Sequence, residues 1–366
     1  MSTAEQAGAL LSVEDLRVEF STPDGVVHAV DGISYSLPPA GTIGIVGESG
    51  SGKTVSALTL IGLTQTQGAT VSGRILFAGR DLLTLSNDEL RRIRGNEIAM
   101  IFQDPLSSLH PQFRVGNQLV EAMRIHRDIS RSAARERATE LLNLVGIPDP
   151  RRRVDQYPHE FSGGMRQRAM IAMALANEPK LLIADEPTTA LDVTVQAQIL
   201  ALLERLRREL GMAIIMITHD LGVVAQVADH IAVMYSGRIV EAADARSLFR
   251  SPQHPYSWGL LRSIPSLEGP RGVELVPIPG RPPSLIRRPS GCHFHPRCAY
   301  ALPSHATIDP GLVEAGGPGH LAACLLDRAQ REAAWAELRA GGTPEQARAA
   351  AGIEEEAVVA PTEVAG

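Results

Sequence analysis

Short apolar runs alternate with amphipathic segments in the first two thirds of the chain. Residues 42–47 (TIGIVG), 181–185 (LLIAD) and 213–218 (AIIMIT) are continuous apolar runs that are short for helices. Strands covered on both faces of a parallel sheet have this pattern. Between the last two runs, residues 195–210 repeat apolar positions at helical spacing, and Gly211 follows as a stop. The pattern predicts a β-α-β unit and an α/β fold.

Other segments predict smaller layers around this unit. Residues 16–20 (LRVEF) and 74–79 (RILFAG) alternate apolar and polar side chains, as half-buried antiparallel strands do. Residues 104–157 carry arginine-rich helical patterns without a convincing strand, which indicates a helical insertion. Residues 231–243 predict a hairpin, and the proline-dense text from 251 to 310 predicts a second, loop-rich module.

Composition narrows the class of protein. The 366 residues are 44% hydrophobic and 21% charged, which is typical of a folded globular protein of about two domains. The net charge of -6 argues against a nucleic-acid binder that relies on overall basicity. The N-terminus lacks a basic and apolar leader, and no apolar run approaches the ~18 residues of a membrane span. We therefore expect a cytosolic chain whose membrane role, if any, is peripheral.

The octapeptide GESGSGKT follows the first apolar run and matches the phosphate-loop pattern G-x-x-x-x-G-K-[ST]. Glycine allows the backbone N–H groups to surround a polyphosphate, and the next helix offers its positive end. Lys53 would contact the outer phosphates and Thr54 would coordinate Mg²⁺. A chance glycine-rich turn is the alternative, but the position between strand and helix is the one that the motif requires. The candidate nucleotide-binding residues are Gly47, Glu48, Ser49, Gly50, Ser51, Gly52, Lys53 and Thr54.

Charged side chains end two later apolar runs. Asp185 and Glu186 close the run at 181–185, and His219 follows the run at 213–218. Beside a phosphate loop, Asp185 can hold magnesium through water and Glu186 can polarise the water that attacks the γ-phosphate. The alternatives are a solvent-facing acidic pair and an ordinary surface histidine. The strand-end positions favour a catalytic role for Glu186 and His219.

These motifs share their order with a known family. FSGGMRQR at 161–168 resembles the signature motif of ATP-binding cassette (ABC) ATPases, Gln103 resembles their Q-loop glutamine, and ALD at 190–192 resembles their D-loop. The resemblance spans residues 12–245. It implies a RecA-like P-loop NTPase core with an antiparallel β subdomain and a helical insertion.

The resemblance also implies residue roles. Ser162, Gly163 and Gly164 would complete the ATP site of an opposite subunit, so that two cassettes close head-to-tail around two nucleotides, and Asp192 would lie in the D-loop. Gln103 would sense the γ-phosphate, join Thr54 and Asp185 around Mg²⁺, and link to a membrane subunit whose coupling helix sits beside the helical insertion. Phe20 is the candidate for stacking on adenine, although a long turn follows it.

Within the family, the chain resembles the ATPase subunits of oligopeptide/dipeptide importers. The segments at 103–111 (QDPLSSLHP), 251–265 (SPQHPYSWGLLRSIP) and 278–285 (IPGRPPSL) carry this resemblance, which reaches about residue 327. The expected parts are a nucleotide-binding domain at 12–250 with a helical subdomain at about 104–170, a C-terminal module at 251–327, and a helical or disordered tail at 328–366.

This resemblance implies an ATP-hydrolysing subunit at the cytoplasmic face of the membrane. Its partners would be two transmembrane permease subunits, a second ABC ATPase subunit and, through the permease, an extracytoplasmic substrate-binding protein, with no nucleic acid. An importer of nickel or another small solute and a soluble non-transport ABC ATPase are the alternatives. A scaffold subunit with a dead site is opposed by intact Lys53, Glu186 and His219.

Three cysteines and a histidine near the C-terminus form a further candidate site. In the peptide-importer branch, four cysteines in this segment can hold an iron–sulphur cluster; here Cys292, Cys298 and Cys324 take three of the places and His305 takes the other. A 4Fe-4S cluster, a zinc ion and plain burial without metal all remain open. His293, His295 and His320 are either alternative ligands or no ligands at all.

Overall fold

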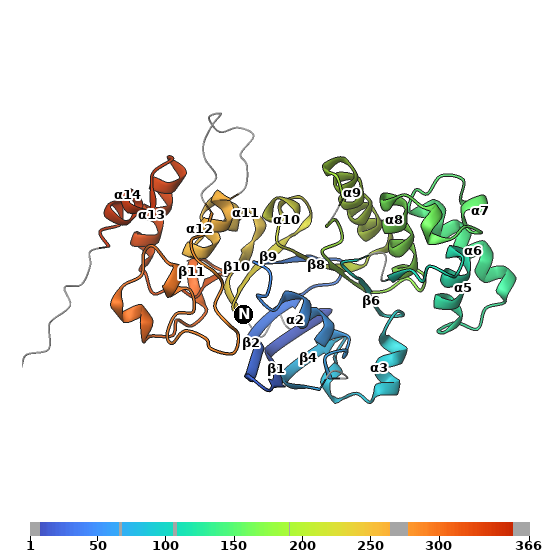
Figure 1. Ribbon diagram of the computed structural model, residues 1–366, viewed down its shortest axis with the longest axis horizontal. Helices are drawn as coiled ribbons and strands as arrows, with labels where there is room; N and C mark the ends of the chain where they lie inside the picture. The colour runs from blue at the N-terminus through green and yellow to red at the C-terminus, as the bar shows by residue number, and fades with distance from the viewer. Residues whose placement is uncertain (1–7, 66–67, 105–107, 190, 264–276, 354–366) are drawn as a thin grey trace, which may run out of the picture.

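The computed structural model describes residues 8–65, 68–104, 108–189, 191–263 and 277–353. Its larger sheet has eight strands in the order β11-β12-β10-β9-β3-β8-β7-β6, and β9, β3, β8, β7 and β6 run parallel (Figure 1). Every residue of the three predicted apolar strands is buried, which confirms the α/β fold. The strands are β3 (Thr42–Val46), β6 (Ile98–Ile101), β7 (Leu181–Asp185), β8 (Ala213–Thr218), β9 (His230–Tyr235), β10 (Arg238–Asp244), β11 (Val313–Gly317) and β12 (His320–Ala322).

A smaller antiparallel sheet packs against one face of the larger sheet. It has the order β2-β1-β4-β5 and contains both predicted alternating strands. Side chains from β1, β2 and β4 share a core with β3, β7 and β8, and α2 (Lys53–Leu60) adds to this core. The strands are β1 (Leu11–Thr22), β2 (Gly25–Leu37), β4 (Ala69–Phe77) and β5 (Arg80–Asp81).

The expected helical insertion gathers at one end of the molecule (Figure 1). Its helices share a core with the opposite face of β7 and β8, together with α9 (Val193–Leu210). Among the described residues of 108–157 there is no strand, as predicted. The helices are α5 (Val115–Arg124), α6 (Arg131–Leu144), α7 (Pro150–Arg153) and α8 (Gly163–Ala174), and α3 (Asn87–Ile93) precedes β6.

The C-terminal module, which we define as the described part of residues 251–353, shares a sheet with the preceding cassette. β12 pairs with β10, so the hairpin of β11 and β12, which follows the proline-dense segment, extends the edge of the larger sheet. The predicted helix after residue 327 is present, and it packs into a core with Trp258 and Tyr300. The frayed end expected at 354–366 lies outside the described residues. The remaining helices are α10 (Leu221–Val227), α11 (Ala245–Arg250), α12 (Pro255–Arg262), α13 (Arg328–Arg339) and α14 (Pro344–Ala350).

None of the described helices has both the length and the apolar character needed to cross a bilayer.

Candidate active site

The predicted phosphate loop connects β3 to α2, and its glycines are needed for its shape. Gly50 and Gly52 have positive φ angles of 78° and 98°, a region that favours glycine. A Cβ on Gly52 would also collide with the carbonyl oxygen of Ala29, and one on Gly47 with that of Met234. The helix α2 begins without a side-chain cap or an acidic residue in its first turn. Its first N–H groups are therefore available to an anion.

Lys53 and Thr54 occupy the start of α2. Lys53 is 5% exposed, and its Nζ donates to the carbonyl oxygens of Gly47 at 2.7 Å and Glu48 at 2.9 Å. Burial lowers the pKa of Lys53, against the opposing charges of Glu186 and Asp185. Ser51 is buried within the loop, whereas Ser49 and Gly50 are exposed at its tip.

The hydroxyl of Thr54 donates to Asp185 Oδ1 at 3.3 Å. Burial raises the pKa of Asp185, because its charged form lacks full solvation at the end of β7. A hydroxyl and a buried carboxylate beside a phosphate loop fit the Mg²⁺ that accompanies ATP.

The three predicted catalytic residues meet at Glu186. Gln103 Nε2 donates to Glu186 Oε2 at 2.9 Å, and His219 Nδ1 lies 3.2 Å from Glu186 Oε1. Gln103 follows β6, Glu186 follows β7 and His219 follows β8, so neighbouring strands deliver the three side chains to one edge of the sheet. Sequence analysis missed Thr189, whose hydroxyl donates to Glu186 Oε2 at 2.8 Å. Its only sequence signal is its position three residues after Glu186.

Hydrogen bonding keeps Glu186 ionised. Burial alone would raise the pKa of Glu186, but the hydrogen bonds from Thr189 and His219 and the charge of Lys53 outweigh it, and the pKa is lowered. The backbone at Glu186 has a φ of 47°, and its N–H donates to the carbonyl oxygen of Ile217 at 2.8 Å. The carboxylate is therefore held in one place as a proton acceptor.

The signature and D-loop residues cap other helices. Ser162 Oγ accepts from the N–H of Met165 at the start of α8, and Asp192 accepts from that of Val195 at the start of α9. Ser162 and Gly163 are exposed and Gly164 is half-buried. The buried Gln167 of α8 donates to the carbonyl oxygen of Pro187 at 2.5 Å, which ties the signature helix to the segment after Glu186. Of the predicted D-loop, Ala190 lies outside the described residues.

Phe20 lies near the turn end of β1, opposite Val27, and is half-buried against the core under the antiparallel sheet. Its stacking on adenine stays a prediction.

The structure does not support a metal at the cysteine segment. Among the described residues, no three His, Cys, Asp or Glu side chains gather around a metal position. The cysteines are free thiols packed against apolar clusters, and burial raises the pKa of all three, that of Cys324 to about 11. His305 Nδ1 accepts from the N–H of Leu302 at 3.3 Å. The iron–sulphur cluster and the zinc ion therefore stay predictions that no contact in the described part of the chain supports.

Two residues that sequence analysis missed reach the phosphate loop from the C-terminal module. Arg297 pairs with the carboxylate of Glu48, and Tyr256 accepts a hydrogen bond from the Glu48 N–H. No local sequence signal marks either contact, because the partners are more than 200 residues apart.

Two family models match the chain. The model described as "ABC transporter" matches residues 30–189, and the model described as "Oligopeptide/dipeptide transporter, C-terminal region" matches residues 240–304. The chain is 53% identical to the oligopeptide transport ATP-binding protein OppD of Salmonella typhimurium, covering 88% of this chain and 95% of that protein. It is 52% identical to the dipeptide transport ATP-binding protein DppD of Bacillus subtilis, covering 82% and 90%.

Solved structures give the same picture of the fold. A dimeric post-hydrolysis state of the ATP-binding cassette MJ0796, bound to ADP and Pi, aligns with a TM-score of 0.57 and 26% identity over 64% of this chain and 99% of that one. The cbiO1 protein of Clostridium perfringens, part of the transporter complex cbiONQ, aligns with a TM-score of 0.57 and 30% identity over 66% and 91%.

Proposed function

The chain belongs to the ABC transporter family, in its oligopeptide/dipeptide branch, and on this premise we propose how it powers peptide import. It is an ATPase, the subunit of a peptide importer that binds and hydrolyses ATP. The observation that carries the mechanism is the ionised Glu186 at the edge of the sheet, bonded to Gln103, His219 and Thr189.

ATP enters as its magnesium complex, with its phosphates on the glycine loop and on Lys53. Thr54, Asp185 and Gln103 would hold the magnesium, which would offset the negative charge of the phosphates. Glu186 orients the attacking water and takes its proton as the water oxygen bonds to the γ-phosphorus. The bond between that phosphorus and the bridging oxygen breaks, and ADP leaves. His219 steadies Glu186 through the contact between its Nδ1 and the carboxylate. The second half of each site is Ser162, Gly163 and Gly164 of a paired ATPase subunit, placed at the positive end of a helix.

An apolar groove supports docking to a permease. A cavity of about 620 Å³ opens between β6, α5 and α8. Two apolar side chains on its wall are exposed, Phe102 at 39% and Ile125 at 69%. Phe102 directly precedes Gln103, so a permease helix in this groove would lie one residue from the catalytic cluster. We therefore place the chain at the cytoplasmic face of the membrane beneath two permease subunits, which receive peptide from an extracytoplasmic binding protein.

The test is co-purification with the permease subunits in detergent, followed by ATP-driven peptide uptake into vesicles. Ile125→Glu puts a charge into the apolar groove, so we expect it to lose at least 10-fold of the co-purified permease and of uptake. Ile308→Glu is the matched control, because Ile308 is also exposed, at 50%, but lies in the C-terminal module. The proposal is contradicted if both variants retain the same amount of permease and the same uptake. ATPase activity that is stimulated only by nucleic acid or ribosomes would also contradict it.

A further inference from the structure

Arg297 lies between Cys292 and Cys298 and reaches into the phosphate loop. Its two terminal nitrogens donate to the two carboxylate oxygens of Glu48 at 2.6 Å and 3.0 Å, a fork that fixes both distance and orientation. The Arg297 side chain is 4% exposed and that of Glu48 is 28% exposed. The pair is thus largely shielded from water. A charged hydrogen bond is stronger in such a place than at the surface.

Two contacts outside the phosphate loop also hold Arg297, one in the module and one to Tyr235 of β9. Arg297 Nε donates to the carbonyl oxygen of Pro279 at 2.8 Å, and the guanidinium lies 5.8 Å from the ring centre of Tyr235. The module also holds the Glu48 backbone, whose N–H donates to the hydroxyl of the fully buried Tyr256 at 2.8 Å. Glu48 is therefore clamped through its side chain and its backbone by residues from one module.

We propose that Arg297 is a positioning residue for ATP binding, which makes the C-terminal module part of the nucleotide site. Arg297 fixes the first turn of the phosphate loop and neutralises Glu48, whose charge would otherwise repel an incoming polyphosphate. The proposal rests on the proposed function, that this loop binds ATP. It also gives the segment GCHFHPRC a role that requires no metal.

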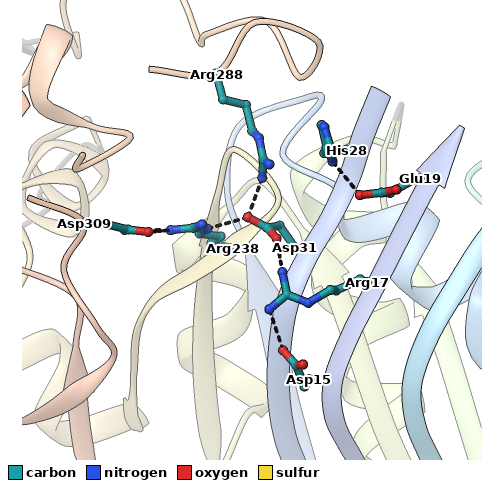
Figure 2. Close-up of polar contacts among 8 residues, drawn as sticks. All are labelled: Asp15, Arg17, Glu19, His28, Asp31, Arg238, Arg288 and Asp309. Carbon is teal, nitrogen blue, oxygen red and sulfur yellow. Dashed lines mark hydrogen bonds and ion pairs between the residues drawn. The ribbon is translucent and has the colours of Figure 1, made fainter. Parts of the chain in front are cut away.

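A second attachment of the module provides a matched control (Figure 2). Arg288 of the module forms an ion pair with Asp31 of β2. Asp31 also pairs with Arg238 of β10 at 2.7 Å and with Arg17 of β1 at 2.5 Å. Arg238 in turn pairs with Asp309 of the module at 2.7 Å. Arg288 anchors the same module through the same chemistry, but its partner carboxylate is outside the phosphate loop.

The experiment measures the affinity of the full chain for Mg·ATP by calorimetry, in the Glu186→Gln background so that ATP is not consumed. Arg297→Gln removes the fork and leaves Glu48 unpaired, so we expect affinity to weaken about 10-fold, the size of one charged hydrogen bond. Arg297→Lys keeps the positive charge without the forked hydrogen bonds, so its affinity for Mg·ATP should lie between those of the parent and Arg297→Gln. Arg288→Gln should stay within about twofold of the parent.

A double-mutant cycle tests the pair itself. In a Glu48→Gln background we expect Arg297→Gln to change affinity by less than about twofold, because the charge that it neutralises is gone. The proposal is wrong if Arg297→Gln keeps parental affinity, if Arg288→Gln weakens binding equally, or if the cycle shows no coupling. Should Arg297→Gln not fold by thermal unfolding, Arg297→Lys carries the same comparisons. Lys53→Ala distinguishes a failure of the Arg297 proposal from a failure of the proposed ATP site. If Lys53→Ala keeps parental affinity for Mg·ATP, the ATP site at the phosphate loop is itself wrong.

Discussion

At the scale of single residues, the carboxylate of Glu186 is the centre of the site, because Gln103, Thr189 and His219 all contact it. Asp185, Glu186 and His219 were predicted because they follow apolar runs whose ends meet at one edge of a parallel sheet. Gln103 came from the family resemblance. Arg297 could not be predicted, because its contact with Glu48 depends on a docking that joins residues 249 positions apart.

The first prediction concerns Glu186→Gln. The amide keeps the size of the side chain but cannot accept a proton, so we expect kcat for ATP hydrolysis to fall by about 10²–10⁴-fold while ATP affinity stays within about threefold. Glu204→Gln is the control, because Glu204 lies on α9 and pairs with Arg207 and Arg208. Steady-state hydrolysis and nucleotide binding measure the two quantities. Hydrolysis at the parental rate would remove Glu186 from the mechanism.

At the scale of elements, continuous apolar runs predicted β3, β7 and β8 because full burial leaves a direct mark on sequence. The edge strands β11 and β12 left no such mark. β12 pairs with β10 across about 80 residues, β11 pairs with β12, and the sequence of β11 mixes glycine with exposed side chains. The module at 251–327 was therefore interpreted as loop-rich, although its hairpin at 313–322 extends the sheet that carries the active site.

The helix α12 depends on a buried neutral histidine. His254 is 1% exposed, and its Nδ1 accepts from the N–H of Tyr256 at the start of the helix. Burial lowers the pKa of His254 to about 3, below its ordinary value near 6.5. The folded protein holds His254 in its neutral form. The stabilisation by neutral His254 is therefore fully present above pH 6.5 and is lost as the pH falls from 6.5 toward 3.

We accordingly expect acid to destabilise the C-terminal module through His254. Between pH 7 and pH 5 the loss is about 2 kcal/mol in the free energy of unfolding. Urea unfolding at the two pH values measures it, and His254→Asn should shrink the difference because asparagine caps the helix without titrating. The same pH dependence in parent and variant would show that other groups cause the effect.

At the scale of the whole molecule, the chain carries the phosphate loop of one ATP site, the signature residues proposed for the site of a paired subunit, and a C-terminal module that contacts the phosphate loop. The phosphate loop connects β3 to α2, and Ser162 caps the start of α8. The helical insertion and the C-terminal module lie at opposite ends of the molecule (Figure 1). We propose that Ser162 acts on the nucleotide of a paired subunit. An isolated chain would then bind ATP well and hydrolyse it poorly.

The most direct test is the ATPase rate of the membrane-reconstituted transporter carrying Ser162→Ala, alongside ATP binding by the isolated variant. We predict that hydrolysis falls at least 10-fold while the isolated chain binds ATP within about twofold of the parent. Ser130→Ala is the matched control, because Ser130 caps α6 by the same Oγ contact, to the N–H of Ala133 at 3.2 Å. Full-rate hydrolysis in the Ser162→Ala transporter, or by an isolated monomer, would contradict the account.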